Sequence, residues 1–192
     1  MIWSIATAAE AKVLFCAGGV DLTSLLNRRA AGRKINLMTT LKCAIDIDAP
    51  KKTVWTVMLE DATYRQWTSA FHEGSHYIGS WDKGSEIQFV AADDDGLSGM
   101  ASKVVENIPY QNISLENLGT IDRGKLDTES DSARQWIGSR EDYYFTEENG
   151  RTHLQIEMRG NNITAETSVM MEKMWRAALQ KLKQIAEALS IA

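Results

Sequence analysis

The sequence predicts an α+β protein in which one long C-terminal helix is laid across one face of an antiparallel sheet. Three observations lead to this prediction. Strand-like runs fill the chain between residues 41 and 159, two short helical segments follow the first run, and an amphipathic helix comes last. A series of strands followed by a helix is typical of a helix packed across one face of a sheet.

The C-terminal helix is predicted from Thr164 to Ser190. Thr164 can cap its start, and Glu166 places a negative charge where it meets the positive end of the helix dipole. Apolar residues recur at steps of three and four and form one stripe: Met171, Met174, Trp175, Ala178, Leu182, Ile185 and Leu189. Such a helix is about 38 Å long and needs a partner surface of similar length.

Residues 1–37 are predicted to lie outside the folded domain, which then spans residues 38–192. The opening segment is apolar, but it contains Glu10 and Lys12 and lacks a basic start, which argues against a secretory signal. The basic run from Asn27 to Lys34 is typical of a transit peptide or a loose tail. Because a regular strand starts directly afterwards, we interpret residues 1–37 as a poorly ordered or non-native extension.

The first strand is predicted from Leu41 to Asp48, where apolar and polar residues alternate strictly. Cys43 is in phase with the apolar residues and is predicted to be a small buried hydrophobe. Pro50 then stands where a proline can open a helix. Two short helices, from Thr53 to Leu59 and from Ala62 to Trp67, are predicted to follow it.

The remaining strands bring the predicted sheet to about six to seven strands. They are Ser75–Ser80, Glu86–Ala91, Leu97–Ile108, Asn112–Gly119, Trp136–Glu147 and Arg151–Arg159. The segment from Thr120 to Arg134 is polar and has no period, so we predict that it forms a long surface loop.

Asn149 and Gly150 join the last two strands, and Asn-Gly is the strongest short-range signal for a β-hairpin. A two-residue turn would pair Phe145 with Leu154, Tyr143 with Ile156, and Glu141 with Met158. This register places the Glu141 carboxylate among core residues, where it is costly unless paired or solvated in a cavity. A different register, or an ion pair with Arg140 or Arg159, is the plainer interpretation.

Composition excludes several classes of function. The 192 residues, 44% hydrophobic and 24% charged, suit one globular domain, and a net charge of −5 with scattered acidic residues offers no footprint for nucleic acid. Cys16 and Cys43 are too few for a disulfide framework and favour a reducing cytoplasm. No run of about 18 apolar residues is present, so no membrane span is predicted.

One metal motif competes with this interpretation. The run His72-Glu73-Gly74-Ser75-His76 matches H-E-x-x-H, in which two histidines one helical turn apart bind zinc, Glu73 acts as general base and Asp82 could add a ligand. The central Gly and Ser weaken a helix, and in the predicted strand the histidines lie about 13 Å apart. We therefore predict no metal, cofactor or catalytic residue, and keep a zinc peptidase as the weakest alternative.

Several short segments resemble a known superfamily. They are Ile47-Asp48-Ala49-Pro50 with Val54-Trp55, Tyr64-Arg65-Gln66-Trp67-Thr68, Gly79 to Ser85 with Ile87 and Phe89, Val105 to Pro109, Glu141 to Phe145 with Gly150 to Leu154, and Trp175 to Lys183. From about Leu41 onwards the chain resembles the START-like, or SRPBCC, helix-grip superfamily. Within it, the chain is most similar to single-domain bacterial proteins related to the activator domain of the large heat-shock ATPase.

This resemblance implies a deep, mainly apolar pocket between the sheet and the C-terminal helix. Members hold lipids, sterols, polyketides or aromatic molecules there, and no catalytic motif is shared among them, so no catalytic residue carries over. We predict a non-catalytic protein that binds a small hydrophobic or aromatic molecule. Two alternatives stay open: a co-chaperone-like regulator of a heat-shock ATPase, and a pocket enzyme of cyclase or hydratase type that uses Glu141.

The predicted pocket lining comes from the aromatic residues, the helix stripe and one carboxylate. Aromatic and methionine side chains suit an adaptable cavity, although each also suits an ordinary core. A buried Glu141 would have a raised pKa and could orient a ligand hydroxyl or act as a general base. The predicted lining is Trp67, Phe89, Glu141, Tyr143, Ile156, Met171, Met174, Trp175 and Ala178, and Tyr64 and Trp136 are further aromatic candidates.

Overall fold

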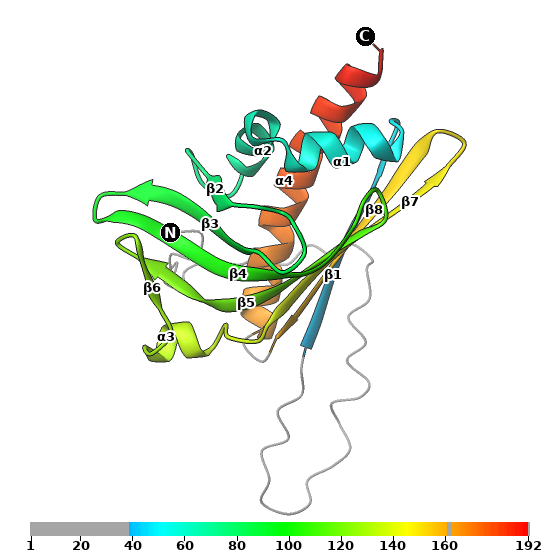
Figure 1. Cartoon of the computed structure of the whole chain (residues 1–192). Coiled ribbons are helices and arrows are strands. Elements are labelled where there is room, and N and C mark those ends of the chain that lie inside the picture. Colours follow the sequence, from blue (N-terminus) through cyan, green and yellow to red (C-terminus); the bar gives the residue numbers. More distant parts are fainter. Residues whose placement is uncertain (1–38, 161–162, 192) are drawn as a thin grey trace, which may run out of the picture.

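The computed structural model describes residues 39–160 and 163–191, and it has the predicted α+β architecture (Figure 1). The predicted extension, residues 1–37, and the predicted start of the domain lie outside the described residues. The strands are β1 (Thr39–Ile47), β2 (His76–Gly79), β3 (Glu86–Asp93), β4 (Gly96–Ile108), β5 (Asn112–Asp122), β6 (Lys125–Asp127), β7 (Arg140–Glu148) and β8 (Arg151–Gly160). The helices are α1 (Lys51–Leu59), α2 (Asp61–Thr68), α3 (Asp131–Arg134) and α4 (Ala165–Ile191).

The strands form one antiparallel sheet with the order β1-β8-β7-β5-β4-β3-β2, and β6 pairs with β5. The predicted loop from Thr120 to Arg134 is therefore only partly right, because it contains β6 and α3. Arg123 and Gly124 have positive φ angles of 48° and 75°, which closes a tight turn between β5 and β6. The strand predicted from Trp136 begins at Arg140, since the residues before it continue in turns after α3.

The hairpin between β7 and β8 has the predicted register. Asn149 and Gly150 have positive φ angles of 52° and 76°, as a two-residue hairpin turn requires. Tyr143 lies opposite Ile156, and Glu141 lies opposite Met158. The register expected from a two-residue turn is therefore confirmed, and the alternative of a different register for Glu141 is wrong.

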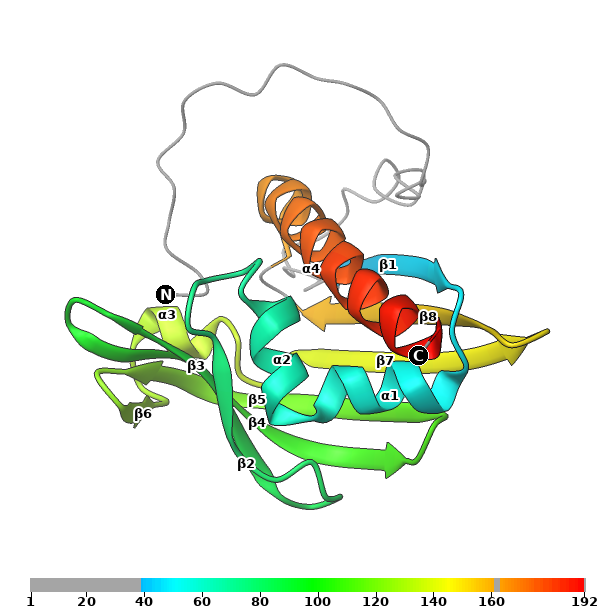
Figure 2. The same ribbon diagram turned by 90° about the horizontal axis from the view of Figure 1, so that it is seen from above.

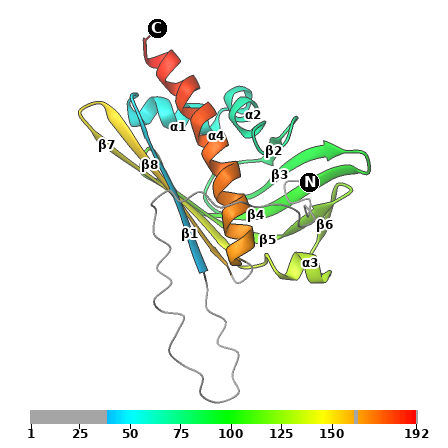
Figure 3. The ribbon, with the colours of Figure 1, turned by 180° about the vertical axis from the view of Figure 1, so that it is seen from behind.

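Helix α4 lies in the concave face of the sheet, with β1, β7 and β8 on one side of it and β2 to β5 on the other (Figures 2 and 3). Its boundaries differ from the predicted ones by one residue at each end. The backbone N–H of Thr167 donates to the Thr164 hydroxyl over 3.2 Å, so Thr164 caps the helix as predicted. The stripe is buried at Met171, Trp175, Ala178 and Leu182, while Leu189 is exposed. The C-terminal end of α4 extends past the sheet (Figure 1).

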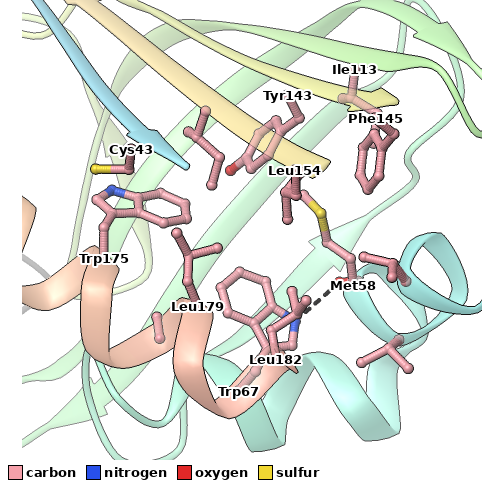
Figure 4. Close-up of a cluster of buried hydrophobic side chains, with 14 of the residues drawn as sticks. Cys43, Met58, Trp67, Ile113, Tyr143, Phe145, Leu154, Trp175, Leu179 and Leu182 are labelled. Carbon is pink, nitrogen blue, oxygen red and sulfur yellow. Dashed lines mark hydrogen bonds between the residues drawn. The ribbon is translucent and has the colours of Figure 1, made fainter. Parts of the chain in front are cut away.

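The C-terminal half of α4 belongs to a closely packed core (Figure 4). Leu179 and Leu182 lie between the strands and α1, and the Trp67 indole donates to the carbonyl of Met58 over 3.2 Å. Two polar contacts hold the helix end to β1 and the turn after it. The Lys183 ammonium donates to the Asp46 carbonyl over 2.7 Å, and the backbone N–H of Asp48 donates to Glu187 over 2.8 Å.

The sheet curves because the pairing of β4 with β5 is irregular. Its register shifts between Ala101 and Ser102 and again between Val104 and Glu106. An extra residue in one strand bends that strand and increases its twist. The central strands therefore turn away from the flat sheet and curl around the N-terminal half of α4.

None of the described helices has the length and apolar character needed to span a lipid bilayer.

We expect Leu182→Ala to lower the free energy of unfolding by about 2–5 kcal/mol, because Leu182 is 1% exposed and its loss leaves a cavity under α4. Leu189→Ala is the matched control, since Leu189 on the same helix is 55% exposed and its loss should cost no more than about 0.5 kcal/mol. Urea denaturation of both variants measures the difference. Equal losses would mean that α4 is not held by the packing described.

Candidate functional site: a pocket between the sheet and α4

A pocket with a volume of about 120 Å³ lies between the N-terminal half of α4, α2 and the central strands. Most of the side chains that border it are aromatic or aliphatic. Its lining consists of Tyr64, Trp67, Phe71, Phe89, Met100, Ser102, Leu115, Asn117, Trp136, Ser139, Arg140, Glu141, Tyr143, Met158, Arg159, Ile163, Met171, Met174 and Trp175. An apolar pocket with a few polar groups is the usual form of a small-molecule site.

The predicted lining residues border this pocket with two exceptions, Ile156 and Ala178. Both exceptions are buried in the packed core, with exposed fractions of 1% and 0%. Ile156 lies opposite Tyr143 on β8, and Ala178 lies one turn beyond Trp175 on α4. The pocket thus ends near Trp175, where α4 passes into the closed core.

Sequence reasoning missed several polar residues of the lining. Ser102 and Asn117 are both buried and come from β4 and β5. The Asn117 side-chain oxygen has no hydrogen-bond partner in the described part of the chain. Asn117 is in phase with Ile113 and Leu115, so an amide at an inward-facing position of a strand was the available signal.

Glu141 and Tyr143 form the polar centre of the pocket. Both come from β7 and face α4, because residues two apart in a strand lie on the same face. The Tyr143 hydroxyl donates a hydrogen bond to the Glu141 carboxylate. Burial raises the pKa of Glu141 from about 4.5 to about 7; the Tyr143 hydrogen bond opposes this rise, and the charge of Asp142 adds to it.

A pKa of about 7 makes Glu141 a group that changes charge near neutral pH. Burial also holds the pKa of Tyr143 well above its ordinary value, and the Glu141 charge and hydrogen bond add to that shift. The pKa of Tyr64 is raised by burial first and then by the charge of Glu141. The phenols therefore stay protonated, and Glu141 alone can take up or release a proton in this part of the pocket.

The ion pairs that the sequence suggested for Glu141 are made by its neighbour. Asp142, which is 1% exposed, pairs with Arg159 and lies 4.0 Å from Arg140. Arg140 also pairs with Glu116 at 3.1 Å. Since Asp142 points to the other face of the sheet, these contacts leave Glu141 without an ion-pair partner among the described residues.

Aromatic rings line the wall opposite Glu141 and hold one another in place. The Trp175 ring lies 6.1 Å from that of Tyr143 and 5.0 Å from that of Phe71, measured between centroids. The rings of Tyr64 and Phe89 are stacked at 6.2 Å. In Figure 4, Tyr143 on β7 and Trp175 on α4 face the same space from opposite sides.

The H-E-x-x-H run does not form the helix that zinc binding requires. His72 lies in a turn after α2, and His76 opens β2, as the sequence predicted. Each imidazole is close to a neighbouring carbonyl, that of Glu73 at 2.7 Å and that of Gly74 at 3.0 Å. In the described ranges, no three His, Cys, Asp or Glu side chains are grouped so that they could hold a metal ion.

The family follows from the sequence as a whole. The model of the family described as activator of Hsp90 ATPase homolog 1-like protein, AHSA1, matches residues 48–187, which is well over half of the chain. The chain belongs to the AHSA1 family. This membership confirms the predicted likeness to relatives of the heat-shock ATPase activator, and the matched range contains α1, strands β2 to β8 and most of α4.

Solved structures share the fold of this AHSA1 member at low sequence identity. The Aha1 dimer from Colwellia psychrerythraea has a TM-score of 0.59 and 17% identity, covering 78% of this chain and 97% of that one. MLL2253 from Mesorhizobium loti has a TM-score of 0.58 and 16% identity, with the same coverage. CalU16 from Micromonospora echinospora has a TM-score of 0.53 and 16% identity, covering 78% and 76%. No curated protein matches the chain in sequence.

We expect Glu141→Gln to stabilise the protein at pH 8 by about 1–3 kcal/mol, and by much less at pH 5. The raised pKa means that the folded protein holds this proton more tightly than the unfolded chain does. The wild type therefore loses stability as the pH rises from about 4.5 to about 7, whereas glutamine does not titrate. Urea denaturation at several pH values measures the difference.

Glu148→Gln is the control, because Glu148 is an exposed carboxylate on the same strand. The free energy of unfolding of Glu148→Gln should equal that of the wild type at every pH. A Glu141→Gln effect of constant size between pH 5 and pH 8 would show that the carboxyl group is not perturbed in the folded protein.

Proposed function

We propose that this chain binds a small, mainly apolar molecule in the pocket between the sheet and α4. The observation that carries the proposal is that the buried side chains of α4 border different surroundings along the helix. Its C-terminal half closes the core, whereas Met171 and Trp175, which belong to the same core, also border the pocket, as does Met174. Protein interiors are close-packed, so an open volume of about 120 Å³ beside this part of the stripe is more than packing alone requires.

The composition of the wall supports the same proposal. Apolar side chains supply the area that binds such a ligand, and Glu141, Tyr143 and Asn117 supply polar contacts that can orient it. The pocket volume of about 120 Å³ approaches that of a dry cavity of about 150 Å³, which accepts benzene. Flexible methionines from β4, β8 and α4 allow the wall to adapt to larger molecules.

Regulation of a heat-shock ATPase is a second candidate. The family description, activator of Hsp90 ATPase homolog 1-like protein, is the observation that favours it. It requires a protein partner, and it is compatible with a ligand in the pocket. The two candidates differ in what must be present for an effect: a small molecule in the first, an Hsp90 ATPase in the second.

We expect the wild-type protein to bind toluene saturably, and we expect Met174→Trp to weaken that binding at least about ten-fold by filling the pocket. Val169→Trp is the matched control, because it adds the same ring to α4 at a residue that is 68% exposed. Ligand-observed NMR with toluene measures both. Absence of saturable binding to the wild type, or equal affinity in the two variants, would contradict the proposed site.

The second candidate predicts that the purified chain raises the steady-state rate of ATP hydrolysis by an Hsp90 ATPase. The increase should saturate with the concentration of the chain, because it depends on a complex of the two proteins. A coupled ATPase assay measures it, with an equal concentration of serum albumin as the control. An unchanged rate at large excess of the chain would remove this candidate.

A further inference from the structure

Among the described residues that line the pocket, Glu141 carries the one charge that its surroundings leave unmatched. Within residues 39–160 and 163–191, no Lys, Arg or His lies at ion-pair distance from it, and its hydrogen bond comes from the neutral Tyr143. Glu141 is half-buried in the wall of the pocket, and a carboxylate partly removed from water without a cation is costly to the folded protein. A ligand that brings a positive charge would offset that cost.

The charged groups that border the pocket do not cancel this negative charge. The guanidinium groups of Arg140 and Arg159 pair with Glu116 and Asp142. Two positive charges thus face two negative ones in that cluster. It contributes no net positive charge to the pocket, and it leaves Glu141 outside its contacts.

Other titratable groups close to Glu141 are neutral at physiological pH. Tyr64 from α2 and Tyr143 from β7 both have pKa values raised above the ordinary value. Burial, followed by the charges of Glu172 and Glu141, raises the pKa of the Cys43 thiol on β1 to about 11. The pocket residues of α4 are Met171, Met174 and Trp175, and those of β4 and β5 include Ser102 and Asn117, none of which titrates.

Aromatic rings surround the same space. The faces of Trp, Tyr and Phe rings attract cations through the ring quadrupole when the cation lies within about 6 Å of the centroid. Trp175 packs against Trp67, Phe71 and Tyr143, so rings from α2, the turn after it, β7 and α4 are fixed around the pocket. Several rings together with one carboxylate form a setting that favours a desolvated organic cation.

We propose that the ligand of this pocket is a small organic cation, an amine or quaternary ammonium group on an apolar body, held by the Glu141 carboxylate and the surrounding aromatic rings. This inference rests on the proposed function and names the class of its ligand. An anionic ligand would meet the repulsion of Glu141, and a neutral hydroxyl compound would leave the carboxylate charge unmatched.

The proposal requires binding to depend on pH in a defined direction. A cation binds the ionised form of Glu141, whose pKa lies at about 7 in the empty pocket. About a tenth of the protein is ionised at this residue at pH 6, and about nine tenths at pH 8. The apparent affinity for a permanent cation should therefore rise about ten-fold between pH 6 and pH 8.

Choline and 3,3-dimethylbutan-1-ol form a suitable pair of probes, because they share shape and hydroxyl group and differ in the charged nitrogen. Choline does not change its charge between pH 6 and pH 8, so any change in affinity reports on the protein. Isothermal titration calorimetry at both pH values should show choline binding at least about ten-fold more tightly than the alcohol at pH 8. The preference should shrink at pH 6.

Glu141→Gln should abolish the pH dependence of choline binding and reduce the preference for choline, while Glu148→Gln, the exposed control, should keep both. If the alcohol binds to the wild type as tightly as choline at pH 8, or if choline binding does not change with pH, the cation proposal is wrong. Saturable binding of toluene or of the alcohol would in that case leave the proposed function standing. If neither probe nor toluene binds, the proposed function fails together with the cation proposal.

Discussion

The packing of α4 in the concave face of the sheet is the contact on which the rest of the structure depends. Strands lie on both sides of α4: β1, paired with β8, is on one side, and β2 to β5 are on the other (Figure 3). A sheet that must enclose a helix has to curve, and the register shifts in β4 and β5 provide that curvature. Curvature and helix together produce a closed core at one end and a pocket at the other.

The position of Glu141 is set by the short turn between β7 and β8. The Asn149–Gly150 turn fixes the register of β7 and β8, and a shift of one residue would exchange Glu141 with Asp142. The observed register directs Asp142 to the two arginines on the outer face and Glu141 to the aromatic wall. One turn thus decides which of two adjacent carboxylates is neutralised by the protein and which is left available.

Much of the fold could be predicted from the sequence, because its signals were local or periodic. The alternation in β1, the Asn-Gly turn and the stripe on α4 each specified an element and the face it buries. The segment with β6 was missed because Arg123-Gly124 is a weak turn signal and a three-residue strand has no measurable period. Its formation depends on the exposed edge of β5, which sequence patterns do not describe.

The candidate site was less predictable, because a pocket is defined by the space that side chains leave open. Periodicity assigned Ala178 and Trp175 to the same stripe, and both belong to the buried core, yet of the two Trp175 alone also borders the pocket. The charge balance of the site was equally hidden, since it depends on which way Arg140 and Arg159 turn.

A fold that needed only stability would do better with an uncharged residue in place of Glu141, because burial raises the pKa of this carboxyl and lowers stability near neutral pH. If the pocket binds a cation as proposed, stability and ligand recognition make opposite demands on the Glu141 side chain.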